Sequence, residues 1–270
     1  MDSEAFRRFE REAHDKLAAT YCEFFAGATR GMIAPLLDGA GVRRGTRVLD
    51  VACGPGEVAA AASARDARVT AVDLSPQMVA LARRNHPKLD VRESDAEALP
   101  FASGVFDAVV CNFGLGHFPL PEAAAGEFAR VLAAGGRLAL SWWDLPGSRV
   151  NAMFFDASAA AGAPPPRDVP EGPPVNRFSS DGALRELLEG AGLCDVAVST
   201  HSWTHHAPSV DVWWRGGLGG MARSAAAIRA QTPAMQERIR AEFERLAVAY
   251  TTDGGYAIPC VAKLGVGTRR

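Results

Sequence analysis

The 270-residue sequence predicts an α/β fold built on a doubly wound, mostly parallel sheet of seven strands. Apolar runs of strand length alternate with segments of helical periodicity, and the connections between them are short. The run Val-Leu-Asp-Val-Ala-Cys-Gly-Pro-Gly at 48–56 leads an apolar strand into a glycine-containing turn. A second apolar run then ends in an acidic residue, Asp73. A strand, a glycine turn and an acidic strand end together are typical of a sheet that holds a nucleotide-like ligand.

The N-terminal segment is predicted to form a helical lid over residues 1–41. Residues 3–28 space their apolar side chains three to four positions apart, which indicates an amphipathic helix. A second, short helix at about 30–39 ends near two glycines, the residue type that commonly follows a helix. We expect this segment to pack over the mouth of the ligand site.

The core is expected to span residues 42–145 and to alternate strands with helices. The predicted strands are 46–51, 68–73, 89–93, 106–112 and 136–142. The predicted helices are 57–65, 76–86 and 121–133. Ser75 and Pro76 suit the N-cap and the first position of the helix at 76–86.

The remaining segments are predicted to complete the core and to cap the site. Residues 146–208 combine a lid loop, a helix at 181–191 and a strand near 194–203, because proline-rich runs at 164–166 and 170–174 oppose regular structure within 144–178. Residues 209–252 are predicted to form a helical insertion over the substrate, with Pro233 opening its long helix. Residues 253–270 are expected to supply a last strand, at 256–264, and a tail.

The net charge, the apolar runs and the cysteine content narrow the kinds of partner and location that this protein can have. A net charge of −2 provides no global field toward nucleic acid or an acidic membrane surface, so no nucleic-acid partner is expected. No segment approaches the ~20 apolar residues of a membrane-spanning helix, and charged residues break any N-terminal apolar run. The five cysteines show no regular framework, which indicates reduced thiols and a cytoplasmic location. The many arginines and alanines indicate a bacterial, GC-rich genome, and the sequence leaves homo-oligomerisation open.

The glycine turn is the first candidate binding site. Gly54 and Gly56 let the backbone bend sharply and approach a ligand where a Cβ would intrude. Asp73 follows at about the ~20-residue spacing of a carboxylate that accepts hydrogen bonds from ribose hydroxyls. The turn alone also fits the dinucleotide pattern G-x-G-x-x-G/A. However, Asp50 at the strand end would crowd a pyrophosphate and suits a cationic ligand instead.

Three further segments follow in order, at Glu93–Phe101, Phe106–Asn112 and Arg130–Leu138. With the turn and Asp73, they resemble the class I S-adenosylmethionine-dependent methyltransferases, in particular the small-molecule branch that includes the ubiquinone and menaquinone C-methyltransferases. The resemblance covers residues 45–143, roughly a third of the chain, and Ala52 stands where many members carry glycine. It implies the Rossmann-like methyltransferase fold, a last strand antiparallel at the sheet edge, and S-adenosyl-L-methionine as the cofactor.

The resemblance also implies roles for the candidate cofactor-binding residues. Asp73 would bind the ribose, and Asp95 would bind the adenine amino group. Leu74 and Met78 would line the adenine, and Asn112 would line the methionine moiety. The full expected set is Tyr21, Asp50, Ala52, Gly54, Gly56, Asp73, Leu74, Met78, Asp95, Ala96, Asn112, Phe113 and His117.

His117, Tyr21 and His14 are the candidate catalytic residues. His117 follows the fourth strand, where ligands bind in such sheets, and imidazole is a suitable general base near neutral pH; a packing histidine is the alternative. Tyr21 and His14 belong to the N-terminal helix, where Tyr21 would touch the methionine carboxylate or serve only as a core aromatic. We expect no metal site, since the cluster His201, His205 and His206 has no cysteine or carboxylate at ligand spacing.

The implied reaction is in-line displacement of the sulfonium methyl group by an oxygen, nitrogen or carbon of a small-molecule acceptor. An apolar or aromatic acceptor, such as a secondary-metabolite scaffold or quinone precursor, is suggested by Trp142, Trp143, Phe154, Phe155, Trp213 and Trp214. An anionic acceptor such as a prenyl diphosphate is left open by Arg149, Arg177, Arg215 and Arg223.

Other functions share these motifs. A protein of this fold that binds the same cofactor and catalyses a pericyclic or decarboxylative reaction would carry the same turn and acidic residues. A nicotinamide-dependent dehydrogenase would explain the turn but not Asp50, Asp95 or Asn112. A non-enzymatic cofactor sensor is the third alternative, which the extensive lid segments disfavour.

Overall fold

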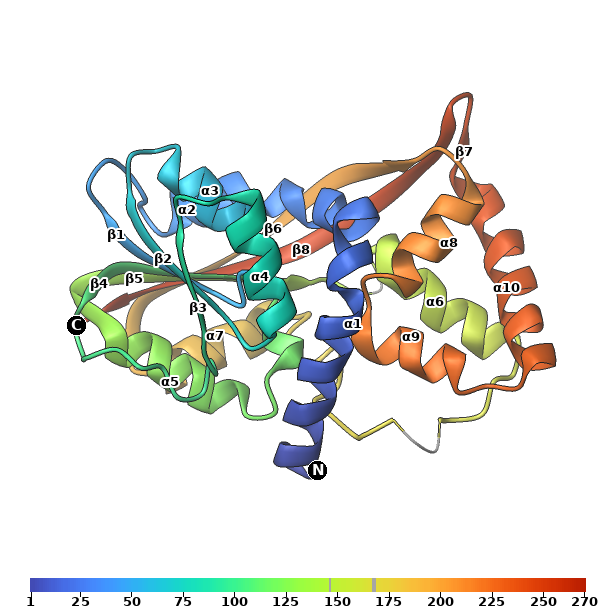
Figure 1. The fold of residues 1–270 in the computed structure, drawn as a ribbon, viewed down its shortest axis with the longest axis horizontal. Coiled ribbons are helices and arrows are strands. Elements are labelled where there is room, and N and C mark those ends of the chain that lie inside the picture. Colours follow the sequence, from blue (N-terminus) through green and yellow to red (C-terminus); the bar gives the residue numbers. More distant parts are fainter. Residues whose placement is uncertain (146, 167–168) are drawn as a thin grey trace.

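The computed structural model describes residues 1–145, 147–166 and 169–270. A mixed sheet with helices on both faces runs through the molecule (Figure 1). Its strands lie in the order β3-β2-β1-β4-β5-β8-β6, with a short β7 paired to β8. Their bounds are β1 Arg47–Val51, β2 Arg68–Asp73, β3 Asp90–Glu93, β4 Phe106–Asn112, β5 Leu132–Trp143, β6 Leu193–Ala207, β7 Thr251–Thr252 and β8 Gly255–Arg269. The predicted doubly wound α/β fold is confirmed.

The strand order reverses between β1 and β4, because β2 and β3 lie on one side of β1 and β4 and β5 on the other. All of these neighbours pair in parallel. β8 is antiparallel, as expected, but the expectation of a final edge strand is wrong. β8 pairs with β5 along one side and with β6 along the other, so β6 is the edge. Strand order depends on long-range pairing, which local sequence patterns do not encode.

Helices cover both faces of the sheet. In Figure 1, α2 and α3 lie on one face and α5 and α7 on the other. Ser75 caps α4 by accepting a hydrogen bond from the Met78 backbone N–H at 3.1 Å, and Pro76 occupies the first position, as the sequence predicts. The bounds are α2 Ile33–Gly39, α3 Glu57–Ser63, α4 Pro76–Asn85, α5 Pro121–Val131 and α7 Asp181–Gly190.

A second, helical lobe stands beside the sheet, and α1 runs between the two (Figure 1). It contains a helix that the sequence did not predict, because 144–178 was expected to lack regular structure. The helix α6 ends at Ala160, ahead of the proline runs, and buries Val150, Met153 and Phe154. The bounds are α1 Ser3–Thr29, α6 Arg149–Ala160, α8 Val210–Leu218, α9 Ala222–Arg229 and α10 Pro233–Ala247. Residues 146 and 167–168 of the predicted lid loop lie outside the described residues.

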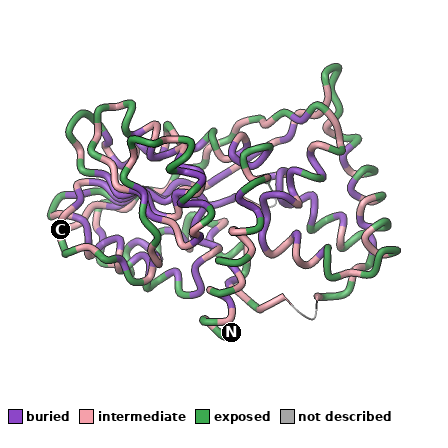
Figure 2. The backbone as a smooth tube through the Cα atoms, in the orientation of Figure 1, coloured by how far each residue is buried: buried purple, intermediate pink, exposed green. Residues whose placement is uncertain are grey.

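Aromatic side chains pack together inside the helical lobe. Figure 2 shows buried, purple segments of backbone in its helices. Trp213 packs edge-on against Phe243 at 5.2 Å between ring centroids, and Trp214 stacks on Phe154 at 5.5 Å. Phe24 of α1 lies directly against Gly216 of α8, so the lid helix and the insertion are closely packed. Among the described residues, none of the helices combines the length and apolar character needed to cross a bilayer.

Candidate functional site

A pocket lies where the strand order reverses, at the carboxyl ends of β1, β2 and β4, under α1. The space inside it, including the part open to solvent, is about 920 Å³. The expected catalytic and cofactor residues line it, apart from Asp50 and Gly56: His14, Tyr21, Ala52, Gly54, Asp73, Leu74, Met78, Asp95, Ala96, Asn112, Phe113 and His117. Residues far apart in the chain thus converge on one pocket.

Asp73 stabilises the glycine turn through hydrogen bonds to the backbone. Its carboxylate accepts hydrogen bonds from the backbone N–H of Gly54 at 2.8 Å and of Ser75 at 2.9 Å. Burial raises the pKa of Asp73, and these two hydrogen bonds oppose that rise. Gly56 has φ +89° and does not line the pocket. A Cβ there would lie 3.0 Å from the His86 ring of α4, so this glycine lets the turn pack against α4.

Asp50 lies in a small recess beside the turn, together with Tyr21, Gly54 and Asn112. It is 1% exposed, and within the described part of the chain its carboxylate oxygens make no hydrogen bond of normal geometry. Burial raises its pKa to about 8, although the Ala59 backbone N–H partly opposes the shift. A buried carboxyl without a partner is costly, so the recess favours a cationic or hydrogen-bond-donating group.

Asp95 also lines the pocket, and Leu74 and Met78 contribute apolar surface to the same lining. Its Oδ1 accepts a hydrogen bond from the Glu97 backbone N–H at 2.9 Å. Its Oδ2 lies 2.8 Å from Nε of Arg7, which also ion-pairs with Glu97. These ion pairs connect α1 to the residues around Asp95. Sequence reasoning missed Arg7.

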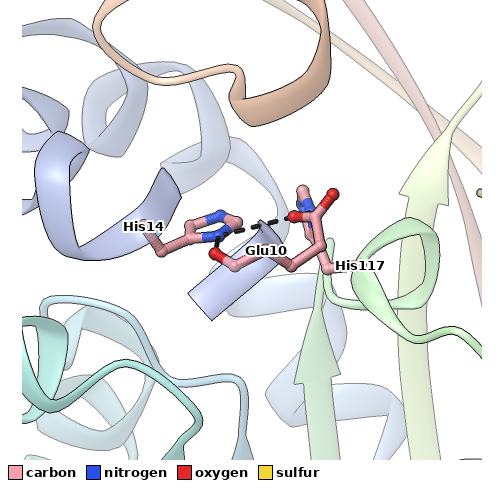
Figure 3. Close-up of side chains that lie close together, drawn as sticks. All are labelled: Glu10, His14 and His117. Carbon is pink, nitrogen blue, oxygen red and sulfur yellow. Dashed lines mark hydrogen bonds and ion pairs between the residues drawn. The ribbon is translucent and has the colours of Figure 1, made fainter. Parts of the chain in front are cut away.

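Glu10 is a second residue that sequence reasoning missed. Figure 3 shows it between His14, on its own helix, and His117, from the 3-10 helix Leu115–His117 that follows β4. Glu10 Oε2 lies 2.8 Å from His117 Nδ1 and 3.5 Å from His14 Nδ1. The signal was present in the sequence, since Phe6, Glu10, His14, Leu17 and Tyr21 share one helical stripe.

The charges around Glu10 decide its ionisation. The side chain is 2% exposed, and burial alone would raise its pKa. The hydrogen bond from His117 and the positive charge of Arg223 oppose this effect, and the pKa of Glu10 lies below its ordinary value, so it is ionised at neutral pH. Its Oε1 lies 3.9 Å from Nε of Arg223 and accepts no hydrogen bond from the residues that the structure describes.

His14 and Tyr21 differ in what they can do chemically. His14 Nδ1 lies 2.8 Å from the Glu10 backbone oxygen, and burial lowers its pKa, so the ring is neutral near pH 7. Burial raises the pKa of Tyr21 well above its ordinary value, which keeps the phenol protonated. Tyr21 can therefore donate a hydrogen bond in the pocket but is a poor base.

No metal site was expected, yet the described residues bring three potential metal ligands together. One atom each of Glu10, His14 and His117 lies within 4.8 Å of the other two. The Arg223 guanidinium beside Glu10 disfavours a divalent cation there, because like charges repel strongly in a buried site. The expected histidine cluster lies elsewhere: His205 packs edge-on against Phe24 at 4.5 Å, and none of His201, His205 and His206 lines this pocket.

A second pocket lies next to the first, because both are lined by Glu10, Phe25, His117, Trp143 and Gly220. Of the aromatic residues expected to face an acceptor, Trp142, Trp143 and Phe155 line this second pocket. The other three, Phe154, Trp213 and Trp214, belong to the core of the helical lobe.

Of the arginines expected near the acceptor, one lines the second pocket and the other three do not belong to its lining. Arg223 lines the second pocket, and it donates hydrogen bonds to the backbone oxygens of Pro173 at 2.9 Å and Gly116 at 3.4 Å. Arg149 pairs with Asp156, Arg177 pairs with Glu122, and Arg215 is exposed on α8. Asn151 also lines the pocket, and none of the described residues hydrogen-bonds to its buried Oδ1.

Comparison with known sequences matches residues 49–140 to the family described as "Methyltransferase domain". A demethylmenaquinone methyltransferase of Thermus thermophilus is 48% identical over 98 residues, covering 34% of this chain and 44% of that protein. An uncharacterised Mycobacterium bovis protein is 31% identical over 193 residues, covering 66% of this chain and 70% of that protein. The chain spans about half the length of several curated relatives, for example 51% of the demethylmenaquinone methyltransferase of Renibacterium salmoninarum.

Solved structures share the fold. YcgJ of Bacillus subtilis superimposes with a TM-score of 0.57 at 23% identity, covering 89% of this chain and 99% of that chain. A Haemonchus contortus phosphoethanolamine N-methyltransferase, solved with S-adenosylhomocysteine, gives a TM-score of 0.53 at 16% identity, covering 88% of this chain and 52% of the other.

Proposed function

Because this chain belongs to the class I S-adenosylmethionine-dependent methyltransferases, with S-adenosylmethionine as its cofactor, we propose that it transfers a methyl group to a small apolar or aromatic molecule. The observation that carries the proposal is the junction of the two pockets. A cofactor in the first pocket and an acceptor in the second would meet at Glu10, Phe25, His117, Trp143 and Gly220.

In this proposal the cofactor lies across the strand ends with its adenine toward Asp95. Asp73 accepts hydrogen bonds from the ribose hydroxyls, and Leu74 and Met78 contact the adenine ring. The ammonium of the methionine moiety is directed toward the Asp50 recess. The unpartnered, buried Asp50 carboxyl supports this orientation, since a cation there would favour its ionised form.

The acceptor occupies the second pocket, where Trp142, Trp143 and Phe155 provide flat apolar surfaces. This lining favours an aromatic or apolar molecule over a prenyl diphosphate, because Arg223 is the one expected arginine in this lining and it already faces Glu10.

Catalysis then rests on positioning and on exclusion of water. An acceptor atom held in line with the sulfonium methyl attacks it, the carbon–sulfur bond breaks, and S-adenosylhomocysteine leaves as a neutral thioether. Positive charge disperses as this happens, so a closed, water-poor site under α1 and the insertion assists the reaction.

The proposal is tested by incubating the protein with methyl-labelled S-adenosylmethionine and a panel of hydroxyaromatics, amines, carboxylic acids and prenyl diphosphates. Label should pass to an aromatic acceptor, and Trp143→Ala should reduce the transfer more than Trp214→Ala, which alters the lobe core. Turnover of an acceptor that proceeds equally well with S-adenosylhomocysteine would instead establish a non-methylating reaction. A cytoplasmic location stays a prediction.

A further inference from the structure

The contact between Glu10 and His117 joins the lid helix to the core. We propose that Glu10 is a positioning residue that holds His117 as the proton acceptor for the methyl acceptor, and that it does so only while α1 covers the site. This inference rests on the proposed methyl transfer and narrows the acceptor to a molecule that must lose a proton, such as an aromatic alcohol.

The protonation of the two side chains determines the roles in this dyad. An ionised carboxylate has no proton to donate, so Glu10 accepts and the His117 Nδ1 must carry the hydrogen of the 2.8 Å contact. When the ring is neutral, its Nε2, on the opposite edge, holds a lone pair that can accept a proton. No hydrogen bond to this Nε2 occurs within the described ranges, and His117 lines both pockets. A proton-accepting atom is therefore left at their junction.

The dyad is assembled from separate parts of the chain. Glu10 comes from α1, His117 follows β4, and Arg223 comes from α9 in the insertion. Arg223 faces Glu10 Oε1 and donates to the Gly116 backbone oxygen, next to His117. If α1 moves away, His117 loses the partner that fixes its tautomer. Closure of the lid and formation of the base are thus one event.

The proposed step balances in atoms and charge. The acceptor O–H bond breaks and its proton passes to His117 Nε2, while an acceptor electron pair forms the bond to the methyl carbon. The carbon–sulfur pair stays on sulfur, so the sulfonium becomes a thioether. The resulting imidazolium is stabilised by the Glu10 carboxylate and returns its proton to water after the lid opens. An amine with a free lone pair would need no such base before attack.

A metal ion is the competing use of the same side chains. Glu10, His14 and His117 offer ligand atoms, but a divalent ion would sit beside the Arg223 guanidinium and would displace the hydrogen bond between Glu10 and His117. The observations favour the proton-transfer dyad, and the experiment below includes the metal as an outcome.

The test is nitrogen-15 NMR of the histidine rings in the complex with S-adenosylhomocysteine, with His117→Asn used to assign the signal. His117 should carry its proton on Nδ1 in the wild type. Glu10→Gln should keep that tautomer through its amide oxygen, whereas Glu10→Ala should shift the proton to Nε2. Glu12→Ala, on an exposed position of the same helix, is the matched control and should leave the spectrum unchanged.

The NMR experiment needs no methyl acceptor. Its outcome can therefore be told apart from a failure of the proposed methyl transfer. If Glu10→Ala fails to bind S-adenosylhomocysteine, the wild-type and Glu10→Gln spectra still show which ring nitrogen of His117 carries the proton. A wild-type proton on Nε2, or no change in a folded Glu10→Ala, would overturn the inference. So would stoichiometric binding of Zn²⁺ that Glu10→Gln abolishes. With a methylated acceptor from the labelling panel, Glu10→Ala should lower kcat about 10²-fold, and Glu10→Gln, which keeps the Nδ1 proton, should lower it less; a kcat of Glu10→Ala within threefold of wild type would overturn the inference.

Discussion

Nε of Arg7 lies 2.8 Å from Oδ2 of Asp95, so the lid helix is ion-paired to the carboxylate proposed to bind adenine. A second pair joins the same arginine to Glu97, and Arg11 lies 2.5 Å from Glu93. These contacts hold α1 over the adenine end of the pocket. Release of the cofactor therefore requires charged pairs to separate.

Arg7→Ala should speed cofactor dissociation. The two ion pairs of Arg7 are partly exposed, and each such pair contributes about 0.2–1 kcal/mol, so loss of both corresponds to a roughly two- to thirtyfold faster off-rate. Stopped-flow displacement of S-adenosylhomocysteine measures this rate.

Salt provides the control for this prediction. Raising the ionic strength shortens the Debye length from about 10 Å at 0.1 M to about 3 Å at 1 M, so wild-type dissociation should accelerate with salt more than that of Arg7→Ala. Arg8 is exposed and forms no ion pair in the part of the chain that the structure describes, so Arg8→Ala should behave like wild type. Equal salt dependence in all three proteins would contradict the role given to Arg7.

Asp50→Asn should stabilise the cofactor-free protein at alkaline pH while weakening cofactor binding. The pKa of buried Asp50 is raised to about 8, above its unfolded value of 3.8. Its stabilising contribution is therefore complete below the unfolded pKa and is lost as pH rises through the folded pKa. The asparagine does not ionise, so the variant should gain roughly 2–8 °C in Tm at pH 8 and little at pH 4.

Thermal unfolding from pH 4 to pH 9, with and without S-adenosylmethionine, measures both effects. Asp38→Asn is the control, since Asp38 is an exposed carboxylate that pairs with Arg65 on the surface. A Tm gain of Asp50→Asn that is the same at pH 4 and pH 8 would show that ionisation of Asp50 is not its cause.

Gly216→Ala should loosen the packing between the insertion and the lid. A Cβ on Gly216 would lie 2.2 Å from Cγ of Phe24, so the two helices must move apart, at a cost of about 1–3 kcal/mol. The variant should lose several degrees of Tm and bind S-adenosylhomocysteine more weakly.

The matched control for that change is Gly126→Ala. Gly126 lies in α5, and a Cβ there meets nothing within 4 Å. Alanine is the better helix former by about 0.5–1 kcal/mol, so this variant should be more stable and bind the cofactor normally. Loss of binding in both variants would show that the contact with Phe24 is not responsible.

The parts of the fold that sequence predicted are those with local causes. Strand–helix alternation, the turn at Gly54 and the cap at Ser75 each depend on neighbouring residues, and each is present. Helix α6 was missed because it is stabilised by packing of residues such as Phe154 against Trp214 and Phe243, which come from later in the chain.

The candidate site also contains residues that local motifs predicted and residues that only long-range packing brings to the site. Residues of the turn and strand ends were identified from motifs, whereas Arg7, Glu10 and the acceptor-side role of Arg223 depend on how the lid and insertion dock on the core. Docking is a long-range property. The one local indication of this docking was Glu10, a charged residue on the apolar stripe of the N-terminal helix.

The central claim is that this pocket binds an adenosyl sulfonium cofactor through Asp73, and calorimetric titration tests it most directly. S-adenosylmethionine and S-adenosylhomocysteine should bind with micromolar affinity to the wild type and fail to bind Asp73→Ala, whose folding is checked by circular dichroism. NADH should not bind. Binding of NADH without binding of either adenosyl compound would contradict the account.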